Sequence, residues 1–170
     1  MFTQPGQLRR FLIAKGRGSF QCIYSPVRGG GELEEHFEHV GRMALEAKNL
    51  ILYVDEIDML CSPAALMPIR SQFWSKPENR QRTPVLSELV NFGRHQGVAM
   101  VLITRVPAQI HRRVTSNCDE MRIFRFSEPN VLSYFGQMNG HLPTILPALP
   151  QFGFALWQQG KEPVQTGGRR

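Results

Sequence analysis

The sequence predicts an α/β protein with a mostly parallel sheet and flanking helices. Strand-like apolar segments alternate along the chain with segments of helical periodicity, as in parallel β-α-β units. The run VAMVLIT at 98–104 is almost continuously apolar, which is typical of a strand buried on both faces. With 170 residues, 42% of them hydrophobic, the chain is large enough for one domain with a sizeable core.

The first half of the chain supplies two predicted helices and two predicted strands. The amphipathic segment QLRRFLIAK at 7–15 predicts a helix, and SFQCIY at 19–24 predicts a strand. From Glu32 onward, apolar residues recur at spacings of three and four, which predicts the second helix. The run at 50–54 predicts the second strand, and the proline-containing stretch 61–83 predicts a long loop.

The second half continues the alternation. Thr83-Pro84 marks a helix start, and Gly97 ends that helix ahead of the strand at 98–104. The remaining predicted elements are a helix from Pro107, an alternating strand at 121–126, a helix capped by Ser127 that reaches Gln137, and a last strand at 152–157.

Composition narrows the class of protein. The net charge is +6 with an isoelectric point near 9.7, and 16 of the 20 basic residues are Arg. This balance permits a nucleic-acid partner, although a genome that favours Arg codons explains it equally well. The three cysteines form no CxxC pair, and no apolar run approaches the ~20 residues of a membrane helix. We expect a cytoplasmic protein with one domain over 1–160 and a flexible tail over 161–170.

Two adjacent acids follow a predicted strand in NLILYVDEIDML at 49–60. In a parallel sheet, ligands bind beyond the carboxyl ends of the strands. Asp55 and Glu56 stand at such an end, where one acid can hold Mg²⁺ and the other can polarise the water that attacks a γ-phosphate. The alternative is a strand end that carries two solvated acids, and the pattern alone leaves both interpretations open.

An ordered series of short motifs resembles the additional-strand P-loop ATPases of the FtsK–HerA superfamily. The similarity is greatest to zonular-occludens-toxin-like and phage or viral DNA-packaging ATPases, and it covers roughly residues 17 to 158. The matching positions are Asp55-Glu56, Gly93-Arg94-His95, Thr104 through Pro107, Ser116-Asn117 and Phe124 through Phe126. The resemblance implies a P-loop NTPase fold of the RecA/FtsK type in which the strand before Asp55 is the Walker B strand.

The resemblance also implies an activity and its participants. The chain would be a subunit of an ATP-driven motor for DNA translocation, packaging or virion export. It would use ATP and Mg²⁺, form a ring with copies of itself, and act on DNA in the cytoplasm of a bacterial host. Other phage or membrane-assembly proteins are further implied partners, so the chain could be associated with a membrane or a virion assembly.

Individual roles follow from the matched positions. Asp55 would position Mg²⁺, Glu56 would be the general base, and Thr104 or Arg105 would sense phosphate. Arg94 would reach a neighbouring subunit's nucleotide, with a helix-end ion pair as the competing interpretation. Two further basic residues would contact DNA phosphates, or would simply form a solvated basic face; they are Arg112 and Arg113.

The sequence departs from the family pattern in two places. Arg105 stands where the family usually has a sensor glutamine. No GxxxxGK[ST] phosphate loop (Walker A) occurs, and KGRGS at 15–19 lacks its Gly-Lys-Ser/Thr end. The chain therefore resembles a family domain that is incomplete at its N-terminus and is expected to be inactive alone.

The missing phosphate-loop strand also has an expected structural effect. In the family this strand lies between the strands that correspond to 98–104 and 121–126. Its absence should leave unpaired strand edges and apolar surface. Three explanations are open: the two neighbours pair directly, another chain covers the gap, or the sequence is a fragment of a longer one. The alternative function is a non-hydrolysing degenerate subunit or adaptor for assembly or DNA binding.

Overall fold

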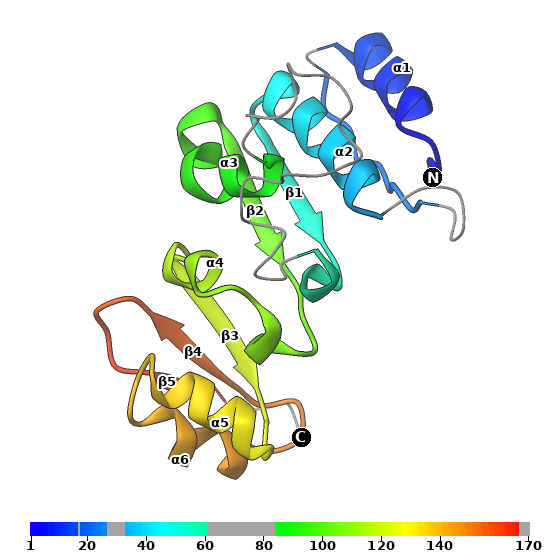
Figure 1. Cartoon of the computed structure of the whole chain (residues 1–170). Coiled ribbons are helices and arrows are strands. Elements are labelled where there is room, and N and C mark those ends of the chain that lie inside the picture. The colour runs from blue at the N-terminus through cyan, green and yellow to red at the C-terminus, as the bar shows by residue number, and fades with distance from the viewer. Residues whose placement is uncertain (17, 27–32, 61–83, 167–170) are drawn as a thin grey trace. The chain divides into compact units, whose positions relative to one another are not determined.

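The structure, a computed structural model, describes residues 1–16, 18–26, 33–60 and 84–166. It confirms the predicted α/β class, with helices packed on strands (Figure 1). The chain divides into two compact units, Met1–Ile103 and Thr104–Arg170, which are described one at a time. The predicted loop at 61–83 lies outside the described residues.

The first unit is a two-stranded sheet covered by helices. In chain order its elements are α1 (Pro5–Lys15), α2 (Leu33–Ala47), β1 (Leu50–Val54), η1 (Ile57–Met59), α3 (Val85–Phe92), η3 (Gly93–Gln96) and β2 (Val98–Leu102). The two strands are parallel, in a register that runs from Leu50 opposite Val98 to Val54 opposite Leu102. The predicted strands at 50–54 and 98–104 are therefore confirmed, and their parallel direction agrees with the predicted mostly parallel sheet.

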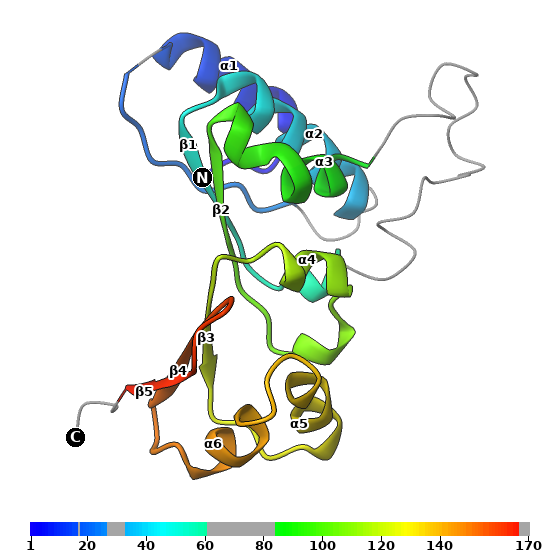
Figure 2. The ribbon, with the colours of Figure 1, turned by 90° about the vertical axis from the view of Figure 1, so that its left-hand side faces the viewer.

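One face of this sheet packs against α2 and α3, which lie on the same side of the strands (Figure 2). The buried cluster between them consists of Leu45, Val85, Leu89 and Val98. Gly41 allows α2 and α3 to approach closely, because a Cβ there would lie 2.8 Å from both Val85 γ-carbons. Burial of this one apolar face stabilises a sheet that two strands alone would leave marginal.

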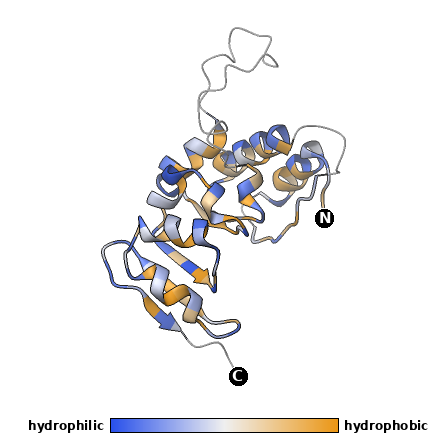
Figure 3. Ribbon diagram, turned by 60° about the horizontal axis from the view of Figure 1, so that its bottom comes forward, coloured by the Kyte–Doolittle hydropathy of each residue, from blue (hydrophilic) through white to orange (hydrophobic). Residues whose placement is uncertain are grey.

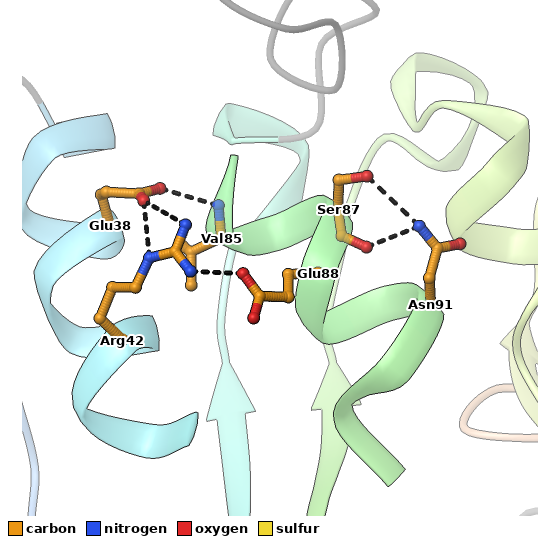
Figure 4. A network of polar contacts seen from close by, with 6 residues as sticks. All are labelled: Glu38, Arg42, Val85, Ser87, Glu88 and Asn91. Carbon is orange, nitrogen blue, oxygen red and sulfur yellow. Dashed lines mark hydrogen bonds and ion pairs between the residues drawn. The ribbon is translucent and has the colours of Figure 1, made fainter. Parts of the chain in front are cut away.

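A polar network joins α2 to the start of α3 (Figure 4). The Arg42 guanidinium donates to Glu38 Oε1 at 3.1 Å and also pairs with Glu88 of α3. Glu38 Oε2 accepts the Val85 N–H at 2.8 Å, so it satisfies a backbone donor that the first turn of α3 leaves without an intrahelical partner. Burial lowers the pKa of Arg42, but the hydrogen bonds and negative charges of Glu88 and Glu38 outweigh this and raise the pKa above its usual value.

The predicted strand at 19–24 is wrong. In the described part of this segment, only Tyr24 forms a β-bridge, a parallel one to Phe2. The alternating pattern packs one aromatic ring, that of Phe20, edge-on against Phe11 at a centroid distance of 5.7 Å. Most of the segment is exposed, and among the described residues it forms no ladder with a neighbouring strand.

The second unit is a three-stranded antiparallel sheet with helices on one face. Its elements are η4 (Pro107–Gln109), α4 (Arg112–Ser116), β3 (Glu120–Phe124), α5 (Pro129–Gly136), α6 (Leu142–Ala148), β4 (Phe154–Gln158) and β5 (Val164–Thr166). The strand order is β3-β4-β5. A buried cluster that includes Ile123, Phe135, Leu142 and Leu146 fills the space between the sheet and α5 and α6.

This unit differs from the sequence prediction in its connections. The sequence predicts one helix between the strands that became β3 and β4, and one crossover helix gives parallel strands. A second helix, α6, is present and packs on α5, so the chain returns to the end of the sheet that it left and β4 runs antiparallel to β3. The predicted helix from Pro107 is also two short helices, because Ile110 and His111 are extended.

Smaller differences lie at element ends. The helix after β3 begins at Pro129 with Glu128 as its N-cap, so the predicted cap at Ser127 is wrong by one residue. The predicted helix that ends at Gly97 is α3 followed by η3. Val164–Thr166, which fall in the predicted tail, form β5.

Apolar side chains and strand edges remain uncovered in both units. On the open face of β1 and β2, the exposed fractions are 59% for Ile51, 66% for Tyr53, 39% for Val101 and 49% for Ile103. Among the described residues β2 pairs only with β1, and β3 only with β4. The helices, in contrast, show the banded hydropathy of elements buried on one side (Figure 3). None of the described helices is long and apolar enough to cross a membrane.

The polar network predicts a local stability effect. Arg42→Met should raise amide hydrogen exchange across α2 and α3 by about tenfold, because it leaves two half-buried carboxylates without their cation. The matched control is Arg9→Met, which removes an ion pair to Glu46 whose side chains are 62% and 64% exposed. The control should change exchange by less than about twofold. Equal effects of the two substitutions would contradict a specific role of the network.

The open sheet face predicts association. We expect the 170-residue chain to bind a hydrophobic dye or to self-associate, since contiguous apolar patches rarely persist on soluble monomers. Ile51→Lys should reduce both signals, whereas Ile13→Lys on α1, away from the sheet, should leave them unchanged. Light scattering that shows a monodisperse monomer with no dye binding would contradict the prediction.

Candidate functional site

Asp55 and Glu56 stand at the carboxyl end of β1, as the sequence predicts, in a backbone irregularity that the sequence does not reveal. The Ile103 N–H donates to Val54 O at 2.9 Å, and the Ile57 N–H donates to Ile103 O at 3.0 Å. In a regular parallel ladder, the second donor would be the residue two positions after Val54. Here it is three positions after, so the strand carries one extra residue, as in a β-bulge.

The bulge determines the backbone conformation of Glu56. Its φ of 52° and ψ of 43° lie in the left-handed region, which costs a non-glycine residue on the order of 1 kcal/mol. The Glu56 N–H, turned away from the ladder, donates to Asp55 Oδ1 at 2.9 Å. Asp55 is exposed and Glu56 is half-buried, so the extra residue presents both acids at the sheet edge where ligands bind in parallel sheets.

Asp55 could contribute to a Mg²⁺ site without forming one alone. Among the described residues, no group of three or more His, Cys, Asp or Glu side chains could hold a metal ion. Mg²⁺ in nucleotide sites is usually bound through one or two carboxylates together with substrate phosphates and water. An exposed carboxylate with one oxygen engaged by the Glu56 N–H fits that limited role.

Arg94 lies at the other end of the same sheet. It is an exposed residue of η3, which immediately precedes β2, whereas the two acids immediately follow β1. Because the strands are parallel and five residues long, the two ends are about 16 Å apart. The first unit therefore does not bring Arg94 together with Asp55 and Glu56 within one chain.

Thr104 and Arg105 are the first residues of the second unit. The Thr104 hydroxyl oxygen accepts the Val106 N–H at 3.0 Å and so stabilises the turn that leads into η4. Arg105 is exposed. This turn is the feature that the sequence identified in TRVP, and its hydroxyl already has a structural partner.

Arg112 and Arg113 occupy the first turn of α4, and both are exposed. His111 caps this helix, since its Nδ1 accepts the Arg113 N–H at 3.1 Å. Within the described part of the chain, neither guanidinium forms an ion pair. Both are therefore available to an anionic partner.

Sequence reasoning missed the residues that support the acids. Ile57 is completely buried, and its backbone together with Ile103 closes the bulge. The signal in the sequence was the apolar residue directly after Asp55-Glu56, which marks the point where the chain turns back into the core.

Comparison with known proteins identifies the fold. No family model and no curated protein matches the sequence. The genome-packaging NTPase B204 of Sulfolobus turreted icosahedral virus 2, in complex with ATPγS, matches with a TM-score of 0.66 and 17% identity over 86% of this chain and 67% of that one. The DNA-packaging ATPase B204 of Sulfolobus turreted icosahedral virus matches with a TM-score of 0.63 and 16% identity over 87% and 67%. The chain thus has the α/β fold of these viral packaging NTPases.

Proposed function

We propose that the chain is a subunit of a nucleotide-driven motor that packages or translocates DNA, or exports virions, for a virus or mobile element. The observation that carries the proposal is the bulged strand end, which presents Asp55 and Glu56 at the ligand-binding edge of the sheet. The fold shared with two viral packaging NTPases supports it independently.

The two acids have different proposed roles. The exposed Asp55 would hold Mg²⁺, which would neutralise charge on the nucleotide phosphates when bound. The half-buried Glu56 would accept a proton from the attacking water as the general base.

ATP is the proposed nucleotide. B204 has been solved in complex with ATPγS and with AMPPCP. The 170 residues contain no GxxxxGK[ST] motif, so the amide cradle for the phosphates would have to come from a segment outside them. The open edge of β2 could accept such a segment as an added strand.

The remaining roles complete the motor. Thr104 or Arg105 would sense phosphate, and Arg94 would act on the nucleotide of a neighbouring copy in a ring. Arg112 and Arg113 would contact DNA phosphates, as their exposure and lack of ion pairs among the described residues allow. The motor would work in the cytoplasm of a bacterial host, with phage or membrane-assembly proteins as further partners.

A non-hydrolysing adaptor of the same fold is the second candidate. The absence of the phosphate-loop motif and the presence of Arg105 in place of the family's glutamine favour it. An adaptor would keep the packing surfaces and the DNA-contacting arginines without turning over ATP.

The motor proposal predicts that catalysis can be restored. Fusing a designed strand–GxxxxGKT–helix segment ahead of Met1 should create Mg²⁺-dependent ATP hydrolysis, which the 170-residue chain should lack. In the restored protein, Glu56→Gln should leave nucleotide affinity within about twofold and lower turnover by at least about 100-fold, as for loss of a general base. Asp55→Asn should weaken the Mg²⁺ dependence.

Glu46→Gln is the matched control, because it neutralises an exposed acid that pairs with Arg9 and lies away from the strand end. It should leave turnover unchanged. Equal turnover of the Glu56→Gln and unsubstituted proteins would reduce the acids to a solvated strand end and overturn the proposal. If the restored protein binds ATP but none of the variants hydrolyses it, the adaptor is favoured.

The position of Arg94 predicts a role only in trans. Arg94→Ala in the restored protein should lower turnover by about 10-fold or more, as for loss of a charge that stabilises the transition state. Mixing this variant with Glu56→Gln subunits should recover turnover, because an Arg94→Ala subunit with an intact Glu56 then borrows the arginine of its neighbour. The measurement is ATP hydrolysis across a series of mixing ratios, and rates that never exceed the weighted average of the two variants would contradict it.

A further inference from the structure

The second unit contains a cavity of about 570 Å³ whose lining residues fall between Arg112 and Glu162. Its walls come from α4, the end of α5 and the β4–β5 connection. The volume lies within the range of about 300–1,000 Å³ typical of small-molecule sites. That size admits one or two nucleotides and excludes a duplex.

A chain of hydrogen bonds fixes one wall. The Tyr134 hydroxyl donates to Thr115 Oγ1 at 3.0 Å, and Thr115, only 8% exposed, donates in turn to Arg112 O at 3.1 Å. Burial raises the pKa of Tyr134, so its hydroxyl stays protonated at neutral pH. Because its proton is donated to Thr115, the phenolic oxygen can still accept a hydrogen bond but has no proton left to donate.

The other walls combine apolar and charged groups. Met138 provides a polarisable apolar surface beside Tyr134, and the small exposed part of Trp157, which is 8% exposed, provides an aromatic one. Arg112 and Lys161 bring two cations; Lys161 Nζ uses one donor on Gln158 Oε1 at 2.7 Å and keeps two. The single acid in the lining, Glu162, lies 3.8 Å from His141 Nε2 and is 77% exposed, so solvent screens it.

We propose that this cavity binds a nucleotide unit, with the planar base between Tyr134, Met138 and Trp157 and the phosphate at Arg112 and Lys161. A nucleobase is flat and carries hydrogen-bond donors at its edge, so it can stack on the aromatic side chains and donate to the Tyr134 oxygen. The adjacent phosphate is an anion, which Arg112 and Lys161 can bind. The unit would be a free mononucleotide or one unpaired nucleotide of a strand. In the second case the inference rests on the proposed DNA function and assigns Arg112 a defined place in it.

The site needs no phosphate loop, so the 170-residue chain itself serves for the test and the result is independent of ATP hydrolysis. In a Trp74→Phe background, Trp157 is the only tryptophan. AMP and dTMP should then quench its fluorescence saturably, whereas inorganic phosphate at the same concentrations should not. A labelled ten-residue oligo(dT), followed by fluorescence anisotropy, tests the strand as the source.

Substitutions distinguish the cavity from general basic charge. Arg112→Gln should weaken binding of the tighter ligand by about tenfold, the loss expected for a hydrogen bond to a charged group. Arg125→Gln removes the same charge from an exposed residue of the same unit outside the cavity, and it should change affinity by less than about twofold. Tyr134→Leu, with its fold checked by circular dichroism, should weaken stacking by about tenfold.

The outcomes separate the two sources and the failure of the site. Tighter binding of oligo(dT) than of dTMP assigns the site to a strand. In that case the slope of log affinity against log salt concentration should decrease in magnitude by about 0.7 in Arg112→Gln. Binding of mononucleotides alone assigns it to a free nucleotide. Three outcomes would overturn the proposal. They are an equal loss of nucleotide affinity in Arg112→Gln and Arg125→Gln, unchanged Trp157 emission at saturating nucleotide, and binding of inorganic phosphate as tight as that of the nucleotides. None of these results depends on whether the restored protein hydrolyses ATP.

Discussion

The two backbone bonds of Ile103 determine the geometry on which the proposed chemistry depends. By bonding both Val54 and Ile57, Ile103 leaves two residues to span the gap between them where a regular ladder allows one. The extra residue is accommodated by the left-handed backbone of Glu56, whose N–H donates to the Asp55 carboxylate instead of joining the ladder. The complete burial of Ile57 holds this arrangement, because straightening the bulge would withdraw that side chain from the core.

That arrangement depends in turn on the helices behind the sheet. Two parallel strands cannot hold a strained turn without cover, and here the cover is α2 and α3 on a single face. The close approach at Gly41 and the Glu38–Arg42–Glu88 network keep the two helices together. The contact at Gly41 is apolar and leaves no room for a Cβ atom. The network is polar and provides a hydrogen-bond acceptor for the Val85 N–H at the start of α3. The network therefore contributes to the positions of the acids.

The features that could be predicted from the sequence are those that follow from the spacing of apolar residues. Strands β1 and β2 and the position of the acids follow from apolar runs that end in polar residues, and the parallel direction follows from the alternation of strands with helices. Counting residues cannot reveal a bulge, because the extra position is defined only against the partner strand. Two prolines made α6 hard to predict. Pro143 lies in the first turn, where a proline costs no hydrogen bond, and Pro147 lies inside the helix near its end. The missed helix reversed the predicted direction of β4, so one local error changed the topology of the second unit.

Two independent observations bear on the choice between the motor and the adaptor: the absence of a phosphate-loop motif and the presence of uncovered apolar surfaces. The first comes from the residues alone, and the second comes from the strand pairing and the exposure of Ile51 and Tyr53. An adaptor needs a partner that covers apolar surface and nothing more. A motor needs a partner segment that also carries an anion cradle to the carboxyl end of β1. The pair of acids separates the two, since a surface used only for assembly does not need an exposed Asp55 and a half-buried Glu56 at the edge where ligands bind in parallel sheets. That argument favours the motor.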